Sequence, residues 1–202
     1  MTRLADSSYA ALLERVAAND PAPGAGPSAA CTCALAAALV EMVSGVALAK
    51  GSDGASATEQ RRDRAAELRA EALDLADRDM AAYTEVLAVL RRRSEPGHGE
   101  RLRAALSGAA DPPMAVVEIA AELTRLAADA AAEARGAVKG EAMTAAILAE
   151  ATVRAGLPLV DLNLASAPDD PRRARVRELA EAAGGDLGRA LEEPQRRRSG
   201  GS

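Results

Sequence analysis

The sequence predicts an all-α protein folded as a helical bundle. About a quarter of its 202 residues are alanine, which is the strongest helix former and a poor strand former. Aromatic residues make up only 1% of the chain, which has two Tyr and no Phe or Trp. A core without Phe or Trp must be filled by small and aliphatic side chains, so we expect helices that pack closely against one another.

Breaks rich in proline and glycine separate the predicted helices. A short helix begins after Ser7 or Ser8, and the segment 20–27 (D-P-A-P-G-A-G-P) that follows excludes helix and strand interiors. Ser28 is expected to cap an apolar helix that reaches about Lys50. Further breaks bound the remaining helices, which we expect at about 58–93, 100–107, 112–134, 141–155, 159–166 and 172–183.

The longest predicted element is the helix over 58–93, which no glycine or proline interrupts. At 1.5 Å per residue it would extend for about 54 Å, so it must pack along most of the bundle. The sequence has no internal repeat and no linker long enough to divide it. We therefore expect one helical domain over 1–190 and a disordered, charged tail over 191–202.

Composition also limits the partners and the location. A net charge of −5 and only two aromatic side chains argue against nucleic-acid binding. Residues 29–49 carry one charge, Glu41, but their Ala, Gly, Ser, Thr and Cys content favours a buried core helix over a membrane span. Two cysteines and no apolar leader predict a cytoplasmic protein.

One acidic residue interrupts the apolar stripe of the long helix. The stripe recurs at spacings of three and four, through Leu68, Ala72, Leu75, Asp79, Tyr83, Val86 and Leu90. A carboxylate in the position of Asp79 is costly unless it is paired or functional, and the Tyr83 hydroxyl can lie beside it one turn later. Asp79 either binds a buried arginine or a helix end, or it belongs to a site.

A second acidic candidate is Glu141. Glu141 and Glu150 lie nine residues apart in one predicted helix and therefore on opposite faces. Glu150 has Arg154 four residues on, which predicts that it faces solvent and that Glu141 faces the bundle. The alternative is that Glu141 is a plain helix N-terminal charge.

Metal-dependent chemistry has little support in the sequence. Cys31 and Cys33 are two residues apart on a helix and cannot jointly bind a metal, and His98 is the single histidine.

The Pro/Gly segment with Ser28 lets backbone approach a ligand at a helix N-terminus, although an ordinary turn is the alternative. The arginine clusters 61–64, 91–93 and 196–198 are solvated ends or counter-charges for an anionic ligand.

Taken in order, several segments resemble the cyclodeaminase domain of the formiminotransferase-cyclodeaminase family. The resemblance extends over residues 8–185 and is carried by L-L-E at 12–14, the Pro/Gly loop and Ala-rich helix from 20 to 43, D-M-A-A-Y at 79–83, P-P-M-A-V-V-E at 112–118, A-A-I-L-A-E-A at 145–151 and L-N-L at 162–164. Two departures stand out, because Ala25 replaces a loop glycine and Gly140-Glu141 replaces the usual Ser-Asp pair.

The resemblance implies an up-and-down bundle that dimerises and a tetrahydrofolate substrate without a metal. The implied reaction converts 5-formiminotetrahydrofolate to 5,10-methenyltetrahydrofolate and ammonia. The alternatives are hydrolysis of the methenyl compound and a diverged, non-catalytic folate-binding dimer. We expect Asp79, Glu141 and Tyr83 to be catalytic, and the substrate to bind at Pro23, Gly24, Ala25, Gly26, Ser28 and Asn163.

Overall fold

The computed structural model describes residues 3–20, 22–51 and 54–192, and all regular structure in these ranges is helical. The elements are a 3-10 helix, η1 (Leu4–Asp6), and the helices α1 (Tyr9–Ala17), α2 (Ala25–Ala49), α3 (Ala55–Leu90), α4 (His98–Ala109), α5 (Asp111–Glu133), α6 (Ala137–Asn163) and α7 (Pro171–Leu191). The prediction of an all-α fold is confirmed. The cluster 196–198 and the expected disorder from 193 onward lie outside the described residues.

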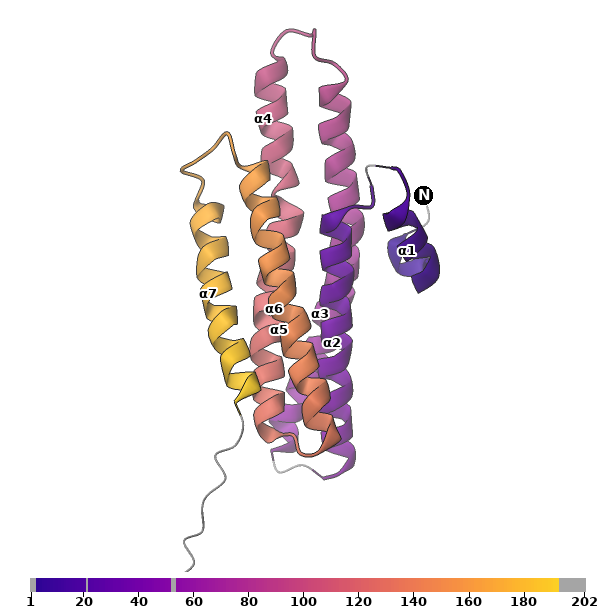
Figure 1. Cartoon of the computed structure of the whole chain (residues 1–202), viewed down its shortest axis with the longest axis vertical. Helices are drawn as coiled ribbons and strands as arrows, with labels where there is room; N and C mark the ends of the chain where they lie inside the picture. Colours follow the sequence, from indigo (N-terminus) through magenta and orange to yellow (C-terminus); the bar gives the residue numbers. More distant parts are fainter. Residues whose placement is uncertain (1–2, 21, 52–53, 193–202) are drawn as a thin grey trace, which may run out of the picture.

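Helices α2 to α7 lie roughly along one axis and form an elongated bundle (Figure 1). α2 packs mainly on α3, and α5 on α6, while α7 covers α5 and α6. Consecutive helices run in opposite directions, except that α4 and α5 follow one another with Ala110 between them. The hairpin of α3 and α4 extends beyond the ends of α2 and α6, and α1 lies at the side of the bundle near the start of α2.

The core is built from alanine and aliphatic side chains. Alanines of α2, α3, α5 and α6 are fully buried, among them Ala36, Ala72, Ala127 and Ala146. α5 and α6 approach so closely that a Cβ at Gly156 would lie 2.3 Å from Cγ2 of Val117. Small side chains therefore set the helix separation here, as the composition predicts.

The start of α2 differs from the prediction. The helix begins at Ala25, so Ala25, Gly26 and Pro27 form its first turn, and Gly24 takes the cap position. Ser28 is not the cap; its hydroxyl donates a hydrogen bond of 2.8 Å to the carbonyl oxygen of Gly24. Pro27 is tolerated because the first N–H groups of a helix have no partner within the helix.

The predicted stop at Gly156 and Pro158 is wrong. α6 continues through both residues to Asn163, with Pro158 inside the helix. Proline removes one helical hydrogen bond, but Val153, Gly156 and Val160 on either side of it are buried against the bundle. Tertiary packing thus overrides the local preference of the chain, and the last turn of α6 is formed.

Two of the described helices, α2 and α6, are long and apolar enough to cross a membrane by length and composition alone. In the structure 39% and 44% of the respective apolar windows are buried inside the bundle. Core helices of soluble proteins meet the same criteria, so this is weak support for a membrane span.

Candidate functional site

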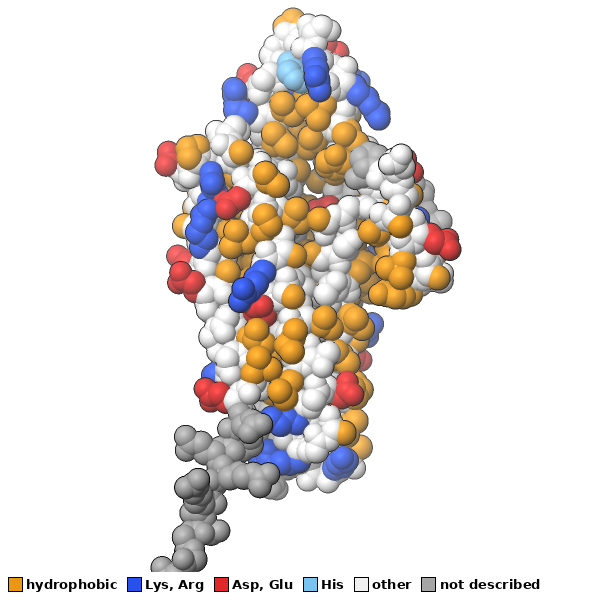
Figure 2. Space-filling view, in the orientation of Figure 1, with side chains coloured by type: hydrophobic (Ala, Val, Ile, Leu, Met, Phe, Trp, Pro, Cys, Tyr) orange, Lys and Arg blue, Asp and Glu red, His pale blue; other side chains and the backbone are white. Residues whose placement is uncertain are grey.

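A cavity of about 200 Å³ opens where the start of α2 meets the upper parts of α3 and α6. In Figure 2 the surface is hollowed below the α3–α4 hairpin, and hydrophobic side chains surround the hollow. Twelve residues from four helices and the segment before α2 line the cavity: Ala22, Gly24, Ala25, Gly26, Pro27, Asp79, Met80, Tyr83, Ala109, Leu159, Leu162 and Asn163.

The carboxylate of Asp79 lies directly against Gly26. A Cβ built on Gly26 would lie 2.4 Å from Cγ and from both carboxylate oxygens of Asp79, closer than unbonded atoms approach. The helical backbone of α2 and the side chain from α3 therefore share a space that only glycine leaves open. This contact joins the Pro/Gly segment and the acidic residue of the long helix, which the sequence indicated separately.

Burial raises the pKa of Asp79 to about 6. The first turn of α2, which has no acidic residue and no side-chain cap, lies against the carboxylate, and the positive potential of a helix N-terminus favours a negative charge there. The pKa is raised nonetheless because the cavity wall is mainly apolar. A carboxyl group of this pKa exchanges protons readily near neutral pH, as a general acid or base must.

Tyr83 lines the same cavity one turn beyond Asp79, with 38% of its surface exposed. Burial, and not the phenol, causes the shift in the pKa of Asp79. Because its side chain is partly exposed, Tyr83 lies at the rim of the cavity with its ring accessible to a ligand. Its predicted role in orienting the carboxylate stays a prediction.

Asn163, in the last turn of α6, is held by the end of α4. Its Nδ2 donates a hydrogen bond of 2.9 Å to the carbonyl oxygen of Ala109. This bond fixes the amide and leaves its Oδ1 as an acceptor at the cavity wall. Since Pro158 does not end α6, Asn163 lies in the last turn of the helix and lines the cavity, and its role in substrate binding stays a prediction.

The other predicted binding residues divide into two groups. Gly24, Ala25 and Gly26 line the cavity, whereas Pro23 is buried beside it and Ser28 lines a different cavity next to α1. Sequence reasoning missed the apolar wall from Met80, Ala109, Leu159 and Leu162. Nothing in the sequence marks Leu162 as a cavity residue, because its position at the cavity and its 71% exposure are known only from the fold.

The structure separates Glu141 from the other catalytic candidates. The prediction that Glu141 faces the bundle and Glu150 faces solvent is wrong, because Glu141 is exposed and Glu150 is only 5% exposed. Glu150 forms an ion pair with Arg154, whose long side chain reaches it from solvent. Glu141 lies near the lower end of α6, in its second turn, about 33 Å along the helix from Asn163 at 1.5 Å per residue.

Metal ligands do not gather in the described residues, where no group of three or more His, Cys, Asp or Glu side chains comes together. Metal-independent chemistry stays a prediction. We call the cavity at the start of α2 the upper cavity. The chemistry available in it is proton transfer by Asp79, hydrogen bonding by Asn163 and by the α2 backbone, and apolar contact with the remaining wall.

Comparisons with known proteins place these features in context. The family described as formiminotransferase-cyclodeaminase matches residues 8–182. A crystal structure of formiminotetrahydrofolate cyclodeaminase from Thermotoga maritima is similar, with a TM-score of 0.80 and 26% sequence identity over 92% of this chain and 94% of that chain. No curated protein sequence gives a significant match.

Proposed function

Because the chain belongs to the formiminotransferase-cyclodeaminase family, we propose that it is a folate enzyme that converts 5-formiminotetrahydrofolate to 5,10-methenyltetrahydrofolate and ammonia. The similar Thermotoga maritima structure is that of a formiminotetrahydrofolate cyclodeaminase. The observation that carries the proposal is the position of Asp79, a carboxyl group with a pKa of about 6 in a mainly apolar cavity.

One carboxylate is sufficient for both proton transfers of this reaction. N10 of the folate attacks the carbon of the protonated formimino group, whose nitrogen becomes a neutral amine, and Asp79 accepts the proton that N10 loses. The same proton then passes to the former imino nitrogen, the bond between that nitrogen and carbon breaks, and ammonia leaves. Asp79 ends as the carboxylate it was at the start, so a pKa near the working pH serves both steps.

The remaining parts of a folate have partners around the cavity. The N–H groups at the start of α2 suit the hydrogen-bonding edge of a pterin, and Leu159 and Leu162 offer apolar contact. The arginines 91–93 follow Tyr83 by about 12 Å along the helix axis. We propose that these arginines bind the anionic glutamate tail.

Absorbance at the methenyl band separates this function from its alternatives. Formation of the band from 5-formiminotetrahydrofolate supports the cyclodeaminase. Loss of the band from 5,10-methenyltetrahydrofolate, faster than in buffer, identifies a cyclohydrolase instead. Tight folate binding with neither change identifies a non-catalytic binder. Asp79→Asn should lower the rate of whichever reaction the enzyme catalyses by at least about 100-fold. An unchanged rate would contradict the acid/base role.

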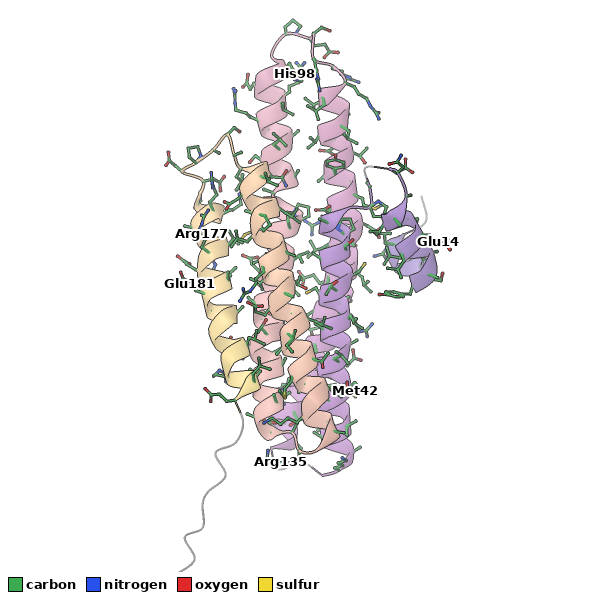
Figure 3. All side chains as sticks on the ribbon, viewed as in Figure 1. Glu14, Met42, His98, Arg135, Arg177 and Glu181 are labelled. Carbon is green, nitrogen blue, oxygen red and sulfur yellow. The ribbon has the colours of Figure 1, made fainter. Side chains whose placement is uncertain are left out.

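We also propose a cytoplasmic homodimer. Large apolar side chains are exposed on the outer faces of the adjacent helices α2 and α6, namely Leu35, Met42, Ile147 and Leu162. Figures 2 and 3 show hydrophobic side chains along this face, with Met42 on the outside of α2. Light scattering should give twice the chain mass, and Met42→Glu with Ile147→Glu should give the monomer. A monomer in the unmodified protein would contradict the proposal.

A further inference from the structure

We propose that the upper cavity selects ligands carrying a delocalised nitrogen cation, of the amidinium or iminium class, for which Asp79 is the counter-ion. The selection rests on the proposed function and specifies the part of a folate that the site distinguishes. It concerns the one-carbon group itself, and not the pterin or the glutamate tail.

The first support is the charge distribution in the cavity. Among the described residues that line it, Asp79 and Tyr83, both on α3, are the titratable ones. The segment before α2, the first turn of α2, the end of α4 and the upper part of α6 contribute residues without ionisable side chains: Ala22, Gly24, Ala25, Gly26, Pro27, Ala109, Leu159, Leu162 and Asn163. Burial is the cause of the raised pKa of Asp79, and no neighbouring charge offsets it.

The second support is the fixed place of the carboxylate. The contact with Gly26 holds Asp79 at the cavity wall, where the helix N-terminus compensates its charge only partly. A ligand cation supplies the remaining compensation, and its attraction is strengthened because the surrounding wall is apolar. A neutral ligand of the same shape leaves the carboxylate without this partner.

Two neighbouring groups favour the same ligand chemistry. The ring of Tyr83 is accessible at the cavity rim, where an aromatic face attracts a planar cation. Oδ1 of Asn163 accepts hydrogen bonds and so suits an N–H group. Carboxylate, aromatic ring and amide oxygen together match a planar group that donates N–H bonds and carries positive charge.

Both the substrate and the product of the proposed reaction carry such a cation. A protonated formimino group on N5 is an amidinium, and the methenyl bridge between N5 and N10 carries the same delocalised charge. Addition of N10 transfers one proton to Asp79, and departure of ammonia takes that proton away, so charge and protons balance. A formyl group at N5 is neutral and lacks the N–H, so it should bind more weakly.

Calorimetric titration with benzamidinium and with benzamide tests the charge preference without a folate. The two probes have similar shape, and benzamidinium keeps its charge over the pH range used. We expect benzamidinium to bind about tenfold more tightly at neutral pH, and the preference to decrease at about pH 5, where Asp79 becomes protonated. Asp79→Asn should remove the preference, whereas Asp74→Asn, an exposed acid of the same helix outside this cavity, should preserve it.

A second titration compares 5,10-methenyltetrahydrofolate with 5-formyltetrahydrofolate, which differ in the charge of the one-carbon group. Tighter binding of the methenyl compound, lost in Asp79→Asn, supports the inference. Equal binding of both members in both probe pairs would overturn it, whatever reaction the enzyme performs. Discrimination between the benzamide probes without folate binding would instead contradict the proposed function and leave the cation selection standing.

Discussion

Two cavities of about 200 Å³ lie at opposite ends of the bundle, and their charges are used differently. The lower cavity is near Arg135, which Figure 3 labels, and Nη2 of Arg61 there donates a bond of 2.7 Å to Oε1 of Glu133. Arg135 binds three carbonyl oxygens at the end of α5. Those charges have partners within the protein, whereas the charge of Asp79 has no ionic partner among the described residues that line the upper cavity.

The contrast teaches that size alone does not identify a site. Of the charged groups of the lower cavity, Arg61 and Glu133 are paired, Arg135 caps a helix end and Lys50 is exposed to solvent, so they demand no ligand. The upper cavity holds one carboxylate against backbone, and burial raises its pKa to about 6. An incompletely compensated charge beside an accessible aromatic ring is the property that separates the two cavities.

The largest expected effect comes from filling the space under the carboxylate. In Gly26→Ala the new Cβ would lie 2.4 Å from three atoms of Asp79, so the carboxyl group must rotate away. We expect methenyl formation to decrease by about 100-fold, because a displacement near 1 Å is enough to disrupt proton transfer. Steady-state kinetics measure the decrease.

The matched control is Gly45→Ala in the same helix, where a Cβ meets no atom within 4 Å. Activity should be retained in this variant, and the unfolding free energy should increase by roughly 0.5–1 kcal/mol because alanine is the better helix former. Equal activity of the two variants would show that the contact between Gly26 and Asp79 does not position the carboxylate.

The second expected effect is on the pH dependence of stability. The folded-state pKa of Asp79, about 6, lies above its ordinary value of 3.8, so folding favours the protonated form. The resulting stabilisation is present below the ordinary pKa and is lost as the pH rises through about 6. Asp79→Asn should therefore increase the unfolding free energy by up to about 3 kcal/mol at neutral pH and by little at about pH 4.

Urea unfolding at several pH values measures this difference. Asp74→Asn serves as the control, because Asp74 is an exposed acid of the same helix that pairs with exposed Arg3. A stability gain in Asp79→Asn that is the same at both ends of the pH range would show that the charge of Asp79 does not destabilise the fold.

A smaller effect is expected at the lower cavity. Arg61→Met keeps the buried stem and removes the ion pair with Glu133, whose side chain is 53% exposed. Such a pair contributes less than about 1 kcal/mol, so the unfolding free energy should change little. Folate turnover should be unchanged, and a marked loss would extend the functional site to this end of the bundle.

The smallest effect is expected at Glu141. Its exposed position at the start of α6 is far from the upper cavity, so Glu141→Gln should change kcat/KM by less than about twofold. Kinetics should be measured on the assembled protein, because a catalytic role of Glu141 would require a second chain in the proposed homodimer. A large loss would restore that role and place Glu141 near a site of the partner.

The helical class was predictable because alanine content and proline breaks act locally. The ends of helices were less predictable, since Ser28 and Pro158 depend on their surroundings. Ser28 follows the first turn of α2, which tolerates Pro27. Pro158 is held in α6 by buried neighbours on both sides. Serine commonly caps a helix and proline commonly ends one, but the packed chain follows neither preference at these two positions.

The candidate site was predictable in part. Asp79 broke an apolar stripe and the Pro/Gly segment preceded a helix, but their contact depends on the axial register of α2 and α3. Glu150 was misread because its pairing with Arg154 does not reveal on which side of the helix the pair lies. In the structure the carboxylate is buried and the arginine, 72% exposed, reaches it from outside.

The alanine core also determines which genetic changes this fold tolerates. In most proteins the damaging core substitutions remove volume and leave a hole, but an alanine has almost no volume to lose. Here the severe changes are those that add atoms, such as Ala→Val at Ala36 or Ala146, which are both fully buried, because neighbouring helices would have to separate. At these alanine positions the close approach of the helices, and not the loss of volume, limits which side chains the core can accept.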